Sequence, residues 1–174
     1  MGLPLVEPKE ASPEVALIYG RITKTFPSIP DWAKALANSP ALLDGFWTHY
    51  DSLMRSEVLP KEARLMIGLD VANTDECPTC ISGFEQMVRD GGFDESIIKD
   101  IEGKVVSPNL DEKVKAIMVA SYAVTMNPHD LNGPVIDSFR NKLSDAELVE
   151  VVGTINLFES ILETVHGLAL HGEE

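Results

Sequence analysis

Two cysteines separated by a proline and a threonine are the residues of this sequence whose types and spacing could do chemistry. They form the segment Cys77-Pro78-Thr79-Cys80, and the other positions of the 174-residue chain contain no cysteine. Cysteines at this spacing close a disulfide with little backbone movement, and a C-x-x-C pair is typical of thiol–disulfide exchange in a reducing compartment. A bridge across so short a loop removes little chain entropy, so we do not expect a structural role.

The proline of this segment predicts where the cysteines lie on a helix. Proline is common at the first helical position, so Pro78 predicts that Cys77 caps a helix and that Cys80 lies one turn inside it. Unpaired N–H groups and the dipole at a helix start stabilise a thiolate, the reactive form of cysteine. We therefore expect reversible dithiol–disulfide chemistry, with reduction of a peroxide as a special case. By analogy with thioredoxin, a more exposed Cys77 would attack disulfides, and the residues alone leave the attacking sulfur open.

Two other interpretations of the cysteine pair remain. A zinc site needs four ligands, so without a second cysteine pair it would have to recruit distant histidines. Alternatively, the two cysteines pack as small apolar residues. A thioredoxin fold is disfavoured because there the motif follows a β-strand, whereas residues 60–72 have a helical period. We expect neither a metal nor another cofactor.

Helix start and stop signals recur along the chain, and strand patterns are scarce. Ser12-Pro13 and Ser39-Pro40 suit helix starts, residues 144–147 form a capping box, and Gly91-Gly92 suit a left-handed helix end. Apolar residues at helical spacing predict helices over 12–26, 31–38, 39–54, 60–72, 77–91, 94–101, 110–127, 134–143 and 144–169. The sequence therefore predicts an all-α, single-domain bundle of about eight or nine helices.

Length and charge limit the classes of partner. A chain of 174 residues fits one domain and buries enough surface to fold without disulfide staples. Its 14 basic and 28 acidic residues leave a formal charge of −14, which repels phosphate backbones and anionic lipid, so we expect no nucleic-acid and no membrane partner. The first residues lack the features of a signal peptide, and no apolar run approaches about 20 residues. These features predict a cytoplasmic protein.

The residues around the cysteine pair also resemble a known family. The segment from Leu59 to Asn73, followed by Cys77-Pro78-Thr79-Cys80, is similar to the core of the alkylhydroperoxidase D / carboxymuconolactone decarboxylase family. The similarity continues through residues 91–98, the helix that starts at position 111 and the helix start at 143–149. Residues 4–47 resemble the N-terminal extension of the family's peroxidase-related branch.

This resemblance implies an all-α domain over residues 1–174, with a helical extension at 1–56 and a core at 57–174 that contains the C-x-x-C helix. It implies a homo-oligomer, either a trimer or hexamer of the core or a dimer of the longer kind. It also implies a peroxidase-like oxidoreductase in which Cys80 meets the peroxide and Cys77 resolves it. The partners would be a small peroxide or disulfide substrate and a thiol reductant protein.

The family's proton-relay residues are replaced in this chain. Family peroxidases have a glutamate twelve residues before the first cysteine, a histidine four after the second and, in some members, a histidine just before the second. Here these positions are Leu65, Phe84 and Thr79, which we expect to form a pocket beside the thiols. A lost general base typically lowers a rate by about 10²–10⁴-fold. We therefore expect thiol–disulfide exchange with only weak alkylhydroperoxidase-like, antioxidant activity.

Three other side chains could replace the relay. Glu62 shares a helical face with Leu65, although the helix dipole alone favours a glutamate in the first turn. His49 lies near the apolar stripe of the 39–54 helix and His166 lies on the stripe of the last helix. For both histidines, the alternative to a proton relay is a satisfied position in a core or an interface.

A second functional hypothesis is a non-catalytic, oligomeric helical protein that kept the fold and binds a small apolar ligand or a partner. The replaced relay favours this hypothesis, and the retained cysteine pair opposes it. Either hypothesis includes a homo-oligomer, because two helices have more apolar surface than one core-facing stripe requires. The residues of this surplus are Phe46, Trp47, Leu157 and Phe158.

Overall fold

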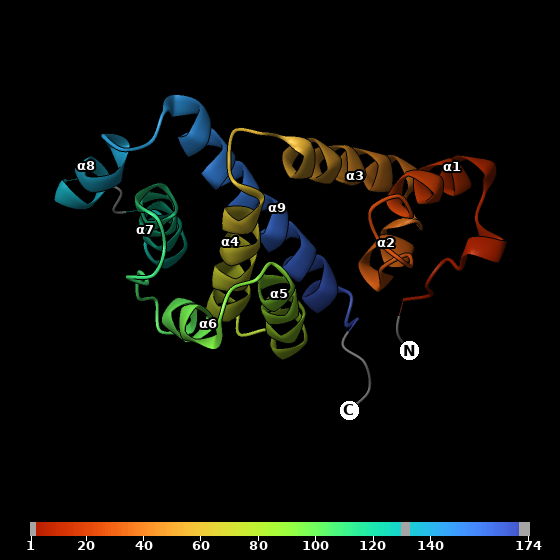
Figure 1. The fold of residues 1–174 in the computed structure, drawn as a ribbon. Helices are drawn as coiled ribbons and strands as arrows, with labels where there is room; N and C mark the ends of the chain where they lie inside the picture. The colour runs from red at the N-terminus through yellow and green to blue at the C-terminus, as the bar shows by residue number, and fades with distance from the viewer. Residues whose placement is uncertain (1–2, 130–132, 171–174) are drawn as a thin grey trace. The chain divides into compact units, whose positions relative to one another are not determined.

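The computed structural model describes residues 3–129 and 133–170, and this part of the chain is helical without a β-strand (Figure 1). Its elements are η1 (Pro8–Glu10), α1 (Pro13–Ile22), α2 (Asp31–Leu36), α3 (Pro40–Arg55), α4 (Lys61–Thr74), α5 (Pro78–Asp90), α6 (Glu95–Glu102), α7 (Glu112–Met126), α8 (Pro134–Arg140) and α9 (Asp145–Gly167). The predicted all-α class is confirmed. Within the same described residues, none of the helices combines the length and the apolar character needed to cross a membrane.

Local capping explains where several helices begin and end. The Ser12 hydroxyl accepts the backbone N–H of Val15 at 3.3 Å, as expected for a cap before α1. The predicted capping box before α9 is present: the N–H of Ser144 donates to the Glu147 carboxylate at 2.7 Å, and the N–H of Glu147 donates to the Ser144 hydroxyl at 3.3 Å. After α5 the chain turns through Gly92, whose φ of 89° suits only glycine well.

The chain divides into two compact units. One comprises Met1–Ser52 with Glu163–Glu174, and the other comprises Leu53–Leu162, so the boundaries fall inside α3 and α9. The predicted single domain, with an extension at 1–56 and a core at 57–174, stays a prediction.

The first unit has an aromatic core. Trp47 is buried and stacks on Tyr50, with ring centroids 5.2 Å apart, and Phe26 meets the edge of Trp47 at 6.2 Å. Phe46 is partly buried and packs against the same cluster. Trp47 and Phe46 therefore serve the core of their own unit, which corrects their interpretation as surplus surface for an oligomer. Both tryptophans of the chain, Trp32 and Trp47, lie in this unit.

In the second unit, α4 is the central helix and packs against α5, α6 and α7 (Figure 1). Its residues are buried almost continuously from Ala63 to Ala72. Two of them, Arg64 and Asp70, are charged, and a buried charge must be paired to be tolerated. On α9, Leu157 and Phe158 are also buried, so they too are unavailable as the predicted oligomer surface.

Candidate active site

The two cysteines form a disulfide at the start of α5. Their Cα atoms are 5.3 Å apart, Cys77 is the N-cap residue and Cys80 lies one turn inside, as predicted. The Sγ of Cys77 accepts the backbone N–H of Cys80 at 3.4 Å. This amide, which has no partner within its own helix, would stabilise a thiolate on Cys77 after reduction of the bridge.

The C-terminal end of α4 positions Cys77. Beyond Thr74 the chain passes through Glu76, which has a left-handed φ of 51°, and the N–H of Cys77 donates to the carbonyl of Ala72 at 3.2 Å. A left-handed residue followed by a hydrogen bond back across five positions is a Schellman-type helix end, in which glycine is usual. Cys77 thus closes α4 with its backbone and caps α5 with its side chain.

The two cysteines differ in exposure. Cys77 is fully buried, whereas Cys80 is partly exposed and is flanked by the exposed Thr79. The sequence-based assumption that Cys77 is the more exposed cysteine is wrong, because the end of α4 holds it against the core. Cys80 is therefore the cysteine with surface that a molecule in solution can reach.

Leu65 and Phe84, at the positions of the family's relay residues, pack against the same core cluster as Cys80. The ring of Phe84 lies over α4 at Gly68, where an added methyl group would be only 2.2 Å from Cε1 of the ring. The same ring meets Phe158 of α9 edge to face, with centroids 4.8 Å apart. The position of the family's histidine is thus an aromatic ring wedged between two helices, and it offers the thiols no proton-handling group.

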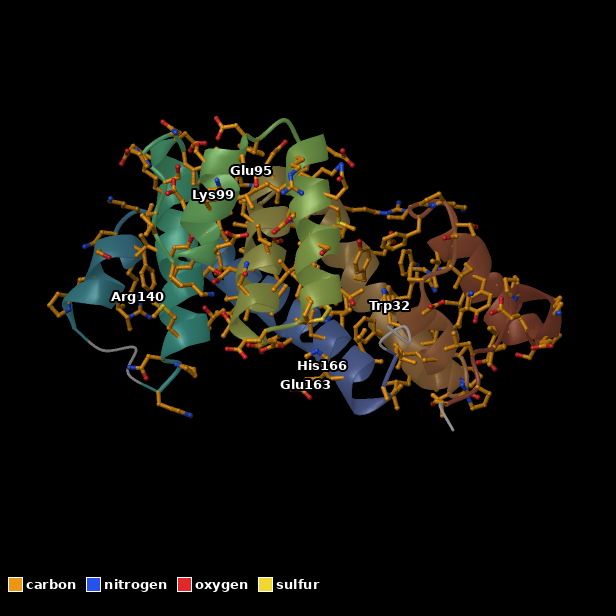
Figure 2. All side chains as sticks on the ribbon, turned by 90° about the horizontal axis from the view of Figure 1, so that it is seen from below. Trp32, Glu95, Lys99, Arg140, Glu163 and His166 are labelled. Carbon is orange, nitrogen blue, oxygen red and sulfur yellow. A yellow bond between two sulfur atoms is a disulfide. The ribbon has the colours of Figure 1, made fainter. Side chains whose placement is uncertain are left out.

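The residues considered as substitutes for the relay lie as follows. Glu62 is exposed in the first turn of α4, where the helix dipole accounts for it. His49 is exposed on α3, which excludes the core position considered for it and leaves the interface position and the proton relay as predictions. His166 is partly buried in the last turn of α9 (Figure 2). Both histidines belong to the first unit, whereas the cysteines belong to the second.

Acidic side chains connect the thiol helix α5 to α6. Arg89 binds Glu85 at 3.0 Å on its own helix and Glu95 of α6 at 3.1 Å. Burial and a hydrogen bond with Glu85 raise the pKa of Glu102 above its ordinary range. Among the residues that the structure describes, no three histidine, cysteine or acidic side chains gather as a metal ion would require.

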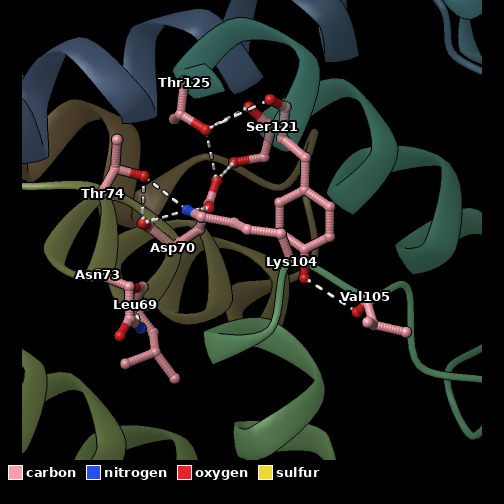
Figure 3. A network of polar contacts seen from close by, with 9 residues as sticks. Leu69, Asp70, Asn73, Thr74, Lys104, Val105, Ser121 and Thr125 are labelled. Carbon is pink, nitrogen blue, oxygen red and sulfur yellow. Dashed lines mark hydrogen bonds and ion pairs between the residues drawn. The ribbon is translucent and has the colours of Figure 1, made fainter.

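A buried polar network lies beneath the end of α4, and sequence reasoning missed it (Figure 3). Asp70 is fully buried and forms an ion pair with Lys104, which follows α6. Its carboxylate also accepts hydrogen bonds from the hydroxyls of Ser121 and, at 3.2 Å, Thr125, both on α7. Burial and the negative charge of Asp70 raise the pKa of Tyr122, which packs beside Lys104. The signal in the sequence was an aspartate inside an otherwise apolar helical stretch.

Fold and site together define an all-α protein with a cysteine pair at a helix start. A peroxidase-related protein from Silicibacter sp. TM1040 superimposes with a TM-score of 0.78 at 19% identity, covering 97% of this chain and 88% of that one. The alkylhydroperoxidase D core protein from Ralstonia eutropha JMP134 superimposes with a TM-score of 0.80 at 14% identity, covering 98% of this chain and 91% of that one. The debrominase Bmp8, in a cysteine-to-alanine variant bound to 2,3,4-tribromopyrrole, has a TM-score of 0.80 at 13% identity, covering 96% and 89%.

The chain therefore has the alkylhydroperoxidase D-like fold. This agrees with the family that its sequence resembles, although at these identities the solved structures establish the fold alone. No protein-family model matches the sequence, and no curated protein matches it.

Proposed function

We propose that the protein is a thiol–disulfide oxidoreductase with weak alkylhydroperoxidase activity, in which Cys80 is the reacting cysteine and Cys77 the resolving one. The observation that supports these roles is the asymmetry of the pair. Cys80 has exposed surface, whereas Cys77 is buried and its sulfur accepts the amide of Cys80.

In the oxidative half-reaction, the Cys80 thiolate attacks the O–O bond of an alkyl hydroperoxide. The bond breaks, the leaving alkoxide takes a proton from water to become the alcohol, and Cys80 becomes a sulfenic acid. The Cys77 thiolate then attacks the sulfenic sulfur, closes the disulfide and expels hydroxide, which is protonated to water. Little backbone movement is needed, because the Cα atoms already lie 5.3 Å apart.

In the reductive half-reaction, a dithiol reductant attacks Cys80 and Cys77 leaves as a thiolate. The Cys80 amide stabilises this leaving group, and stable leaving thiolates speed the exchange. The second thiol of the reductant then closes its own disulfide and frees Cys80. A small dithiol protein fits this role, and a reducing compartment such as the cytoplasm would maintain the cycle.

The roles can be tested with single cysteine variants. Two thiols should titrate after reduction and none after mild oxidation. After treatment with cumene hydroperoxide, Cys77→Ser should accumulate a sulfenic acid that a cyclic diketone traps, and Cys80→Ser should not. The proposal fails if both thiols stay unreactive in the folded protein, and the assignment of roles reverses if the trapped variant is Cys80→Ser.

Peroxide turnover should be slow because Leu65 and Phe84 supply no proton relay. The double change Leu65→Glu with Phe84→His should raise the rate of peroxide-dependent oxidation of the cysteine pair by at least about tenfold. This minimum is set lower than the usual effect of a general base, which is about 10²–10⁴-fold. Each single change should do less, since a relay needs both members. A wild type that already reduces alkyl peroxides rapidly, with the double variant no faster, would mean that another base acts at the site.

The apolar surroundings of Cys80 favour a second candidate, which is binding of a small apolar ligand. Leu65, Ile81 and Phe84 pack into the same cluster as Cys80. Titration calorimetry with 2,3,4-tribromopyrrole, the ligand of one structurally similar protein, tests this candidate. Saturable binding that persists in a Cys77→Ser, Cys80→Ser double variant would favour binding without redox chemistry.

We also propose that the protein forms a homo-oligomer, through a surface different from the one expected from the sequence. On α9, Val149 and Val152 are exposed one turn apart. Light scattering at micromolar concentration should return a multiple of 19.0 kDa, and Val149→Lys with Val152→Lys should reduce it. A mass equal to that of one chain would exclude the oligomer.

A further inference from the structure

Lys104 binds the C-terminal turns of α4 through its ammonium group, and we call its contacts with Asp70 and Thr74 the Lys104 clamp. Its ammonium group donates to the main-chain carbonyl of Asp70 at 2.9 Å, to the carboxylate of Asp70 and to the hydroxyl of Thr74 (Figure 3). An ammonium group has three donors, so these contacts use all of them. Lys104 holds this position from a left-handed backbone conformation, with a φ of 53°. A strained backbone persists only where surrounding contacts determine it.

The same turns of α4 are anchored on a second side. The carboxylate of Asp70 accepts from Ser121 and Thr125, and the Thr74 hydroxyl donates back to the carbonyl of Asp70 at 2.9 Å. A buried polar network whose members are satisfied makes its region rigid. The last turns of α4 are thus tied both to the segment after α6 and to α7.

These anchored turns hold Cys77. The carbonyl of Ala72 accepts the N–H of Cys77 at 3.2 Å. Ala72 lies between Asp70 and Thr74, the two residues to which the Lys104 ammonium group donates. Without the contacts that Lys104 makes with Asp70 and Thr74, the Schellman-type end of α4 could open, and Cys77 would move out of the core together with its backbone.

We propose that Lys104 is a positioning residue of the thiol pair: its clamp on Asp70 and Thr74 keeps Cys77 buried, so that only Cys80 reacts with molecules in solution. The role given to Cys77 rests on the proposed function, whereas the burial that the clamp enforces can be measured without any turnover. The clamp thus selects which sulfur meets the substrate.

The test measures alkylation of each cysteine in the reduced, full-length protein with iodoacetamide, by mass spectrometry over time. In wild type, Cys80 should react well ahead of Cys77. A buried thiol reacts through local opening of the structure. Lys104→Met should therefore raise the alkylation rate of Cys77 by about tenfold or more, while the alkylation rate of Cys80 stays within about twofold of the wild-type rate. Lys104→Arg, which keeps a cation, should stay close to wild type.

Arg64→Met is the matched control. It removes a buried cation from the other end of α4, far along the helix from Cys77. The alkylation rate of Cys77 in this variant should therefore stay within about threefold of the wild-type rate. If Lys104→Met does not fold, the double variant Asp70→Asn with Lys104→Met removes both charges of the pair and carries the same expectation. The proposal is overturned if Cys77 stays protected in these clamp variants, or if Arg64→Met exposes it equally.

The two proposals fail separately. If Cys77 becomes exposed as expected but neither peroxide nor disulfide is ever reduced, the positioning role stands and the proposed function falls. If the pair turns over substrate but Cys77 is no less protected without Lys104, the function stands and the positioning role falls.

Discussion

The two ends of α4 each bury a charged side chain, and they satisfy it differently. At the C-terminal end, Asp70 is paired with Lys104 and also accepts from two hydroxyls of α7. At the N-terminal end, Arg64 donates to the carbonyl of Ser56 and lies 3.6 Å from the carboxylate of Glu150. Within the described residues, no hydrogen-bond partner meets the Nε of Arg64 or the Oε2 of Glu150.

The comparison distinguishes the C-terminal end of α4, which its polar contacts make rigid, from the N-terminal end, which should tolerate substitution better. An unsatisfied buried polar atom costs about 1–3 kcal/mol, and a satisfied network in a low dielectric is strengthened by its members. The satisfied end is the one that continues into Cys77. Among the described residues, the buried polar side chains at the end of α4 that continues into Cys77 have hydrogen-bond partners, whereas two buried atoms at its other end lack one.

The largest expected effect is that of Lys104→Met. It leaves the Asp70 carboxylate buried without its counter-charge, which should lower the free energy of unfolding by about 3–5 kcal/mol. Urea unfolding followed by circular dichroism measures it; tryptophan fluorescence would report the first unit, because both tryptophans lie there. Asp70→Asn with Lys104→Met should cost less than the single change, and a single change costing under about 1 kcal/mol would contradict the comparison.

Arg64→Met should cost less, about 1–3 kcal/mol, in the same experiment. The guanidinium is only partly satisfied, and the Glu150 side chain that it leaves behind is 17% exposed and so can be hydrated. An equal or greater loss than that of Lys104→Met would show that the N-terminal end is as strongly determined as the C-terminal one.

Gly68→Ala probes the middle of α4, where the Phe84 ring covers the helix. The new methyl group would overlap the ring, which also packs against Phe158, so we expect a loss of about 1–2 kcal/mol. In a Phe84→Ala background, the same change should instead stabilise by about 0.5–1 kcal/mol, since alanine is the better helix former. No change of sign between the two backgrounds would mean that the ring moves away freely.

Glu76→Gly should have the smallest effect. Glycine relieves the left-handed strain at the end of α4 but loses more chain entropy on folding, so we expect a gain of at most about 1 kcal/mol. Glu76→Ala keeps the strain and should give no gain. A clear loss of stability in Glu76→Gly would show that the glutamate side chain itself holds the turn.

The sequence by itself determined the features that depend on neighbours within a few positions. Pro78 predicted the cap at Cys77, and the Ser144–Glu147 box and the glycine at position 92 appeared where the pattern placed them. Such signals are reliable because a cap or a helix end is closed by hydrogen bonds between residues three to five apart. The all-α class followed from the same local rules.

Only the tertiary structure decided the environment of the cysteine pair. The burial of Cys77 and the exposure of Cys80 depend on how α4 ends against its neighbours, and Asp70 meets Lys104 from 34 positions away. The wedge of Phe84 against Phe158 of α9 likewise joins distant segments. A helical period shows which face of a helix is apolar, but not which distant side chain will lie against it, because that depends on the packing of the whole core.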